Sequence, residues 1–182
     1  MKLGLAAVAA LLAMGTMACR TQCMADEDAT PDQMAKEKRA ALRAQVVCKE
    51  LQRPTIDARG ERLKLSASRE VDVAPRADVP ADAPRFEPLF TRLDRYKRHY
   101  RQVWPADQWE PFAYVELDPK LDGAKAKTLV STVAGAGYTS FRITAGDAKV
   151  DIVWGLCGSK IPDAPAATAV DLVTAFTAVC KK

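Results

Sequence analysis

The sequence predicts an α+β protein, a two-layer sandwich with helices on one face of a mixed or antiparallel sheet of about four to five strands. Several short segments alternate apolar and polar residues, which is the period of a half-buried strand. Longer segments repeat apolar residues every three or four positions, which is the period of a helix packed on one side. Each strand keeps one polar face, so we expect helices to cover only the other face. A composition of 48% hydrophobic and 27% charged residues is typical of a globular protein.

The N-terminal half is predicted to begin with a helix, continue into a hairpin and then lose regular structure. Residues 29–54 are rich in Ala, Lys, Arg and Glu, and Thr30 before Pro31 is a typical helix start. Residues 55–71 have the alternation of two strands around the turn "ARGE". Residues 72–88 hold four of the 11 prolines, so we expect an extended loop without a core of its own.

Helices and strands are predicted to alternate from residue 87 onward. Residues 87–104 form an amphipathic helix, and its apolar positions are Leu89, Leu93, Tyr96, Tyr100, Val103 and Trp104. We expect next a strand, a helix capped by Asp122, two strands joined by a turn at Gly146, and a final helix. These elements span residues 112–118, 123–137, 140–144, 148–154 and 165–180.

The N-terminus has the pattern of a secretory signal peptide. One Lys precedes an uncharged apolar stretch over residues 3–12, and small residues follow before Cys19. The apolar stretch is shorter than the roughly 20 residues of a transmembrane helix. We therefore expect an exported, periplasmic protein that is soluble or lipid-anchored to the cell envelope. The expected organisation is a signal peptide at 1–18, a tether and helix at 19–54, and one α+β domain at 55–182.

The cysteines bear on how the chain is processed. The stretch "TMAC", which ends at Cys19, resembles the lipobox of bacterial lipoproteins, whose cysteine is acylated and becomes the mature N-terminus. Ordinary cleavage after Ala18 or after Ala25 is the alternative. Acylation of Cys19 leaves four of the five cysteines, an even number suited to two disulfides in an oxidising compartment. The connectivity that we favour among three is Cys157–Cys180 with Cys23–Cys48.

The residues that could carry chemistry favour structural roles. Gly135 and Gly137 follow a helix and precede a strand, which is the reverse of a phosphate loop, so they mark a helix end. We expect Glu116, Asp118 and Asp122 to be a strand residue and a capped turn rather than an acid/base pair or a cation site. The cysteine spacing completes no zinc site. The sequence therefore predicts no catalytic residue, cofactor or metal.

A basic stripe on the helix at residues 87–104 is the strongest candidate for a binding surface. Arginines recur every three residues with a lysine beside them, at Arg92, Arg95, Lys97, Arg98 and Arg101. Such a stripe could meet anionic lipid, a cell-wall polymer or an acidic partner. Its alternative is the solvated back of a packed helix. The net charge of +4 is mild and requires no nucleic-acid partner.

The order of elements over residues 55–152 resembles the periplasmic domain of the ExbD/TolR family of biopolymer-transport proteins. The resemblance rests on a hairpin, a helix, a strand ending at Asp118, and a helix closing on Ala136–Gly137 before another strand. It implies a periplasmic α+β module that dimerises and contacts envelope proteins or peptidoglycan. Family members also carry an N-terminal transmembrane helix with a functional Asp, whereas the apolar segment at residues 3–17 holds no acidic residue. The family's proton-coupled role is therefore not expected.

The expected function is that of a non-enzymatic envelope lipoprotein, a binding module for an envelope protein partner or peptidoglycan, with a homodimer implied by the resemblance. Two alternatives are a secreted enzyme of unrecognised class and a structural spacer domain. A cleft joining the single histidine, His99, to Glu116 or Asp118 would favour the enzyme. A shallow surface with His99 facing solvent would favour binding.

Overall fold

A six-stranded mixed sheet forms the centre of the protein. The computed structural model describes residues 49–67, 69–103, 109–155 and 166–180, and the strand order is β3-β2-β1-β4-β5-β6. β1 pairs in parallel with β4, and β4 with β5, while the other neighbours are antiparallel. The strands are β1 (Thr55–Ala58), β2 (Arg62–Ser66), β3 (Glu70–Pro75), β4 (Phe112–Leu117), β5 (Ser140–Ala145) and β6 (Ala148–Val153). The α+β class is confirmed, with six strands where four to five were expected.

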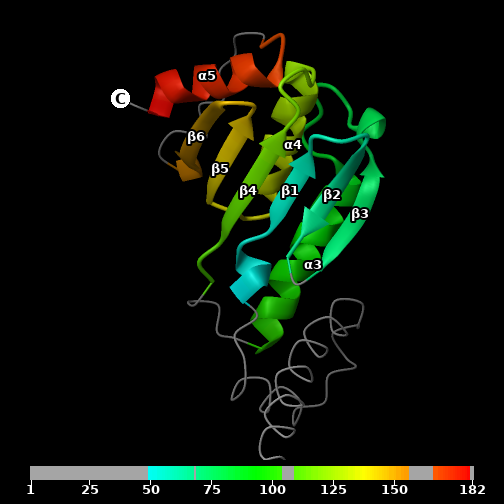
Figure 1. The fold of residues 1–182 in the computed structure, drawn as a ribbon. Helices are drawn as coiled ribbons and strands as arrows, with labels where there is room; N and C mark the ends of the chain where they lie inside the picture. Colours follow the sequence, from blue (N-terminus) through cyan, green and yellow to red (C-terminus); the bar gives the residue numbers. More distant parts are fainter. Residues whose placement is uncertain (1–48, 68, 104–108, 156–165, 181–182) are drawn as a thin grey trace, which may run out of the picture.

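The helices of the described part of the chain leave one face of the sheet uncovered. They are α3 (Glu87–Val103), α4 (Gly123–Gly135) and α5 (Ala169–Cys180), with short 3-10 turns η2 (Lys49–Gln52) and η3 (Arg76–Asp78). α3 and α4 connect the parallel strands, since parallel pairing requires a crossover. Both lie behind the sheet in Figure 1, and α5 lies next to β5 and β6. We call the face without described helices the open face.

The covered face of the sheet supplies the hydrophobic core. On β4, Ala113, Val115 and Leu117 are buried, whereas Tyr114 and Glu116 are only half-buried. β1, β2, β5 and β6 alternate in the same way. The helices add Leu89, Leu93, Tyr96, Leu129, Val130, Val133, Leu172, Val173 and Phe176 to this core. Since each buried side chain of this size contributes about 1.5–3 kcal/mol, these contacts fix the helices on one face, as the alternation predicted.

β3 corrects the expectation of an irregular loop over residues 72–88. Val71 and Val73 are half-buried against the core, so this segment gains apolar burial by adding a strand beside β2. Pro75 is tolerated because it ends an edge strand, where its missing N–H breaks no ladder bond. The register shifts between Leu63 and Lys64 on the neighbouring strand. The irregularity bends the strand pair locally.

The rest of that loop is fastened to α4 by two buried threonines. Thr128 Oγ1 donates to the carbonyl of Ala83 (3.2 Å) and accepts from its N–H (3.1 Å). Thr132 Oγ1 accepts from the N–H of Phe86 (2.8 Å) and donates to the carbonyl of Thr128 (2.7 Å). Val79 and Phe86 are themselves buried. The loop therefore contributes to the core, contrary to the expectation from its prolines.

The ends of α4 agree with the sequence. Asp122 caps its start by accepting a backbone N–H of the first turn (3.1 Å). Gly137 has a φ of 93° and donates its N–H to Ala134 (2.9 Å), and Tyr138 donates to Val133 (3.3 Å). These two bonds make a Schellman motif, which requires the left-handed conformation that glycine adopts most easily. Gly135 and Gly137 therefore lie at the end of α4. The helix comes before these glycines and β5 comes after them, which is the reverse of the order in a phosphate loop.

The expectations for the N-terminus and for four of the five cysteines lie outside the described residues. They concern the signal peptide, the tether and helix at 19–54 up to residue 48, and the cysteines Cys19, Cys23, Cys48 and Cys157. Cys180, the last residue of α5, is disulfide-bonded, and its partner also lies outside this part of the chain. The pairing with Cys157 stays a prediction. Within the described ranges, no helix has the length and apolar character needed to cross a membrane.

Candidate binding surface

Two rows of polar side chains cross the open face, each with one residue from every strand. The register of the strands sets the residues of each row opposite one another. The residues that alternate with them along each strand point to the other face and form the core. The first row is Glu70, Ser66, Thr55, Tyr114, Arg142 and Asp151. The second row is Asp72, Lys64, Asp57, Glu116, Thr144 and Lys149. The open face is therefore strongly polar and carries both signs of charge.

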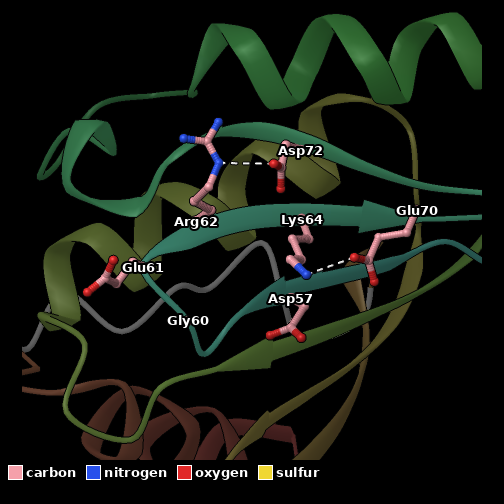
Figure 2. A pocket seen from close by; sticks show the side chains of 7 residues that line it. All are labelled: Asp57, Gly60, Glu61, Arg62, Lys64, Glu70 and Asp72. Atoms are coloured by element: carbon pink, nitrogen blue, oxygen red, sulfur yellow. Dashed lines mark hydrogen bonds and ion pairs between the residues drawn. The ribbon is translucent and has the colours of Figure 1, made fainter.

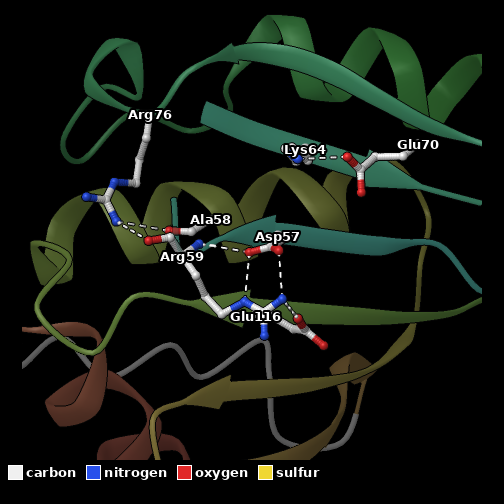
Figure 3. Close-up of polar contacts among 7 residues, drawn as sticks. All are labelled: Asp57, Ala58, Arg59, Lys64, Glu70, Arg76 and Glu116. Atoms are coloured by element: carbon white, nitrogen blue, oxygen red, sulfur yellow. Dashed lines mark hydrogen bonds and ion pairs between the residues drawn. The ribbon is translucent and has the colours of Figure 1, made fainter. Parts of the chain in front are cut away.

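Arg59 joins two carboxylates of the second row, as Figure 3 shows. Parallel pairing sets Asp57 beside Glu116, two negative charges that would otherwise repel. The guanidinium of Arg59 donates to both oxygens of Asp57 (3.0 and 2.7 Å) and lies 2.8 Å from Glu116. These hydrogen bonds hold the pKa of Asp57 below its ordinary value. Asp57 is therefore a fixed anion at neutral pH.

A second bidentate pair lies on the opposite half of the open face. Arg142 on β5 donates to both carboxylate oxygens of Asp151 on β6, at 2.7 and 2.9 Å. The hydrogen bond lowers the pKa of Asp151 and raises that of Arg142. Both side chains are about half exposed. The pair links the last two strands across the surface.

An open depression of about 570 Å³ lies over β1, β2 and β3. Its lining residues are Asp57, Gly60, Glu61, Arg62, Lys64, Glu70 and Asp72. Figure 2 shows two ion pairs along it, Arg62 with Asp72 (3.1 Å) and Lys64 with Glu70 (2.8 Å). The four side chains of these pairs are between 43% and 58% exposed. The depression thus presents both signs of charge to solvent, and we call it the β1–β3 depression.

Each of the three carboxylates considered in the sequence analysis, Glu116, Asp118 and Asp122, has a hydrogen-bond or ion-pair partner that gives it a structural role. Asp118 accepts from the backbone N–H of Lys120 (2.8 Å) and from Arg76 (2.6 Å), and both contacts lower its pKa. Arg76 also donates to the carbonyl of Ala58 (3.1 Å), so it joins the ends of β1 and β4. Glu116 pairs with Arg59, and Asp122 caps α4. Within the described residues, no three His, Cys, Asp or Glu side chains gather as a metal site would need.

The basic stripe winds around α3 instead of forming one face, which corrects the expectation for it. A step of three residues falls about 60° short of a full turn, so Arg92 and Arg101 lie on opposite sides of the helix. Arg98 is exposed and pairs with Asp94 of its own helix (2.5 Å). Half-buried members are Arg92, Arg95 and Lys97, and exposed members are Arg98 and Arg101. The exposed part of the stripe is therefore reduced to Arg98, which is paired with Asp94, and Arg101.

His99 fits neither arrangement that the sequence suggested. It is 8% exposed and lies on α3, on the covered side of the sheet. Glu116 lies on the open face, so the sheet separates the two side chains. Asp118 is engaged by Arg76 at the end of β4. His99 therefore neither shares a cleft with these described carboxylates nor faces solvent.

Sequence reasoning missed Arg59, Arg142 and Asp151, although one signal was present. Arg142 and Asp151 hold polar positions in two predicted strands and lie at equal distances from the turn between them. Opposite charges at mirrored positions of a hairpin predict a cross-strand pair. Arg59 offered no such signal, because its contact with Glu116 depends on a parallel pairing that local patterns do not reveal.

Comparisons with protein-family models, with curated proteins and with solved structures found no significant match to the chain.

Proposed function

We propose that this protein is an exported, non-enzymatic binding module of the bacterial envelope, held by a lipid on Cys19 in the periplasm, that binds peptidoglycan or an envelope protein partner. The signal-like N-terminus and the lipobox-like "TMAC" support export and anchoring. The disulfide at Cys180 fits an oxidising compartment. An exposed surface, rather than a deep site, is what such a module would use for recognition.

The open face is the observation that carries this proposal. It spans six strands, none of the described helices covers it, and its carboxylates are paired with arginine or lysine side chains. A general acid at neutral pH needs a raised pKa, whereas the pKa values of Asp57, Asp118 and Asp151 are all lowered. Groups that stay ionised and fixed in place suit recognition of a charged partner better than proton transfer.

The order of elements supports an ExbD/TolR-like domain as part of the same proposal. β4 leads directly into Asp118, and α4 closes at Gly137 before β5. In that family the periplasmic domain dimerises and contacts envelope components. For this chain we propose the same kind of periplasmic domain and its homodimer. The family's proton-coupled role is not part of the proposal, because that role depends on an Asp and residues 3–17 hold no acidic residue.

Co-sedimentation tests the proposed binding. The mature protein is incubated with purified peptidoglycan sacculi, and in parallel cross-linked in intact cells to capture envelope proteins. We expect saturable sedimentation or one dominant cross-linked partner. Absence of both would refute a binding module and favour a spacer, while turnover of an envelope component by the pure protein would favour the enzyme.

A charge-reversal variant decides whether α3 takes part. Changing Arg98→Glu and Arg101→Glu reverses the two exposed members of the basic stripe without touching buried groups. Loss of capture assigns binding to α3, because its anionic partner would now be repelled. Unchanged capture excludes Arg98 and Arg101 from the binding surface. Reversal of Arg92 and Arg95 in addition extends the test to the half-buried members.

A further inference from the structure

We propose that the β1–β3 depression binds a short peptide group that carries a free carboxylate together with ammonium groups, such as a peptide end containing a diamino acid. This inference rests on the proposed function and names the ligand class and its site. Neither the open face as a whole nor the basic stripe on α3 specifies such a ligand. The depression does, through its shape, its exchangeable ion pairs and its charge balance.

The shape of the depression leaves its floor accessible from solvent. Three strands supply its lining, and the turn between β1 and β2 enters it at Gly60. A methyl group placed on Gly60 would meet no atom within 4 Å. The depression is open to solvent, and its volume of about 570 Å³ leaves room for a small ligand against the three strands. A peptide group of two or three residues therefore fits without a change of backbone.

The two ion pairs of the depression can exchange partners at little cost. Arg62 with Asp72 and Lys64 with Glu70 are about half exposed, and exposed pairs contribute little stability. A ligand carboxylate can replace Asp72 or Glu70 beside a cation, and a ligand ammonium can then take the released carboxylate. Every charge keeps a partner during this exchange. A ligand with only one sign of charge would leave one side of a pair unmatched.

The charge balance of the lining sets the sign of the ligand. Asp57, Glu61, Glu70 and Asp72 supply four carboxylates, whereas only Arg62 and Lys64 supply cations. Arg59, just outside the lining, shares its single positive charge between Asp57 and Glu116. The depression therefore keeps an excess of negative charge. The complementary ligand carries both signs with a net positive charge, as a peptide with a free N-terminus, a lysine-like side chain and a free carboxylate does.

Titration with the tripeptide Ala-Lys-Ala tests this inference on the mature protein at low salt, followed by NMR shifts of backbone amides. We expect saturable shifts confined to β1, β2 and β3. Acetylation of both amines should weaken binding about tenfold or more. Amidation of the carboxylate should also weaken it, although the amide is the more cationic peptide. If the amide binds as well as the free acid, a simple acidic surface explains the result and the inference fails.

A pair-neutralising variant removes one ion pair without introducing like charges opposite one another. Lys64→Gln with Glu70→Gln breaks an exposed pair that contributes little stability, so binding of Ala-Lys-Ala should fall while the thermal midpoint stays close to that of the wild type. The matched control, Arg142→Ala with Asp151→Ala, removes a pair on the same face outside the depression and should bind normally. Equal binding by the neutralised and wild-type proteins would overturn the inference. Capture of sacculi without any tripeptide binding would overturn it too, while leaving the proposed function standing.

Discussion

Arg76 shows how one side chain can hold the ends of two strands. Its guanidinium donates to the carbonyls of Ala58 and Arg59 and to the carboxylate of Asp118. Arg76 and Asp118 are only about a quarter exposed, so water replaces these bonds poorly. The same carboxylate looked at first like a candidate for chemistry. Its partners show that it stabilises the end of β4.

We expect Arg76→Ala to lower the free energy of unfolding by about 1–2 kcal/mol, because it leaves two carbonyls and a carboxylate without their donor. Urea denaturation measures the change. The control is Arg62→Ala, which breaks a pair that is half exposed and should cost less than about 0.5 kcal/mol. Equal losses for the two variants would contradict the role assigned to Arg76.

Gly137 is the second position where one residue decides local structure. Gly137→Ala should destabilise the protein by about 1–2 kcal/mol, because its φ of +93° is a conformation that alanine adopts poorly, whereas the end of the flexible Lys97 side chain can move away from the new Cβ. Gly135→Ala is the matched control, since Gly135 lies in α4 with open space around it. It should raise stability by up to about 1 kcal/mol. Thermal unfolding of both variants measures these effects, and we expect the two changes in stability to have opposite signs.

At the scale of the element, periodicity predicted α3, α4, α5 and five of the six strands, but not β3. The hairpin of β1 and β2 and the pair β5 and β6 follow from alternation and turn residues. β3 was hidden because its Pro75 indicated a loop, although its valines face the core. The parallel pairings are long-range, so local patterns do not reveal them. The contact of Arg59 with Glu116 depends on one of these pairings, whereas the β1–β3 depression was missed because β3 was not predicted.

The proline-rich loop after β3 depends on α4 for its position. Thr132→Val should cost about 1–3 kcal/mol, because the buried N–H of Phe86 loses its acceptor. Hydrogen exchange at the amide of Phe86 and urea denaturation measure the effect. Thr174→Val is the control, since that exposed hydroxyl only donates to a carbonyl of its own helix. Unchanged exchange at Phe86 would show that the loop holds its place without Thr132.

For the whole molecule, the ion pairs of the open face and of Asp118 predict a loss of stability in acid. The pKa values of Asp57, Asp118 and Asp151 are lower in the folded protein than their ordinary values. Groups of this kind stabilise the folded state fully above the unfolded pKa of about 3.9, and the stabilisation is lost as pH falls through the lower folded values. Thermal midpoints should be level from pH 7 to about 5 and fall below about 4.

The variant Asp118→Asn sharpens that measurement. Its side chain cannot titrate, so its thermal midpoint should fall less steeply below about pH 4 than that of the wild type. The variant is expected to start from a lower midpoint at pH 7, because Arg76 loses a charged partner. A wild-type midpoint that rises on acidification would contradict the lowered pKa values.

The overall organisation joins a covered face that holds the core to an open face that stays ionised and exposed. This division suits an anchored module whose sheet meets a partner in the envelope. The proposal also depends on the processing of the N-terminus, which the fold of the domain does not determine. The processed form of the chain therefore decides whether the domain is exported and anchored.

The intact mass of the protein isolated from cells measures this processed form directly. We predict a chain that begins at Cys19 and carries a diacylglyceryl-sized addition. We also predict a mass difference on reduction that reports the disulfides, with one of them at Cys180. A chain that has lost its first 25 residues and carries no acyl group would contradict the lipid anchor. A chain that retains Met1 would contradict export itself.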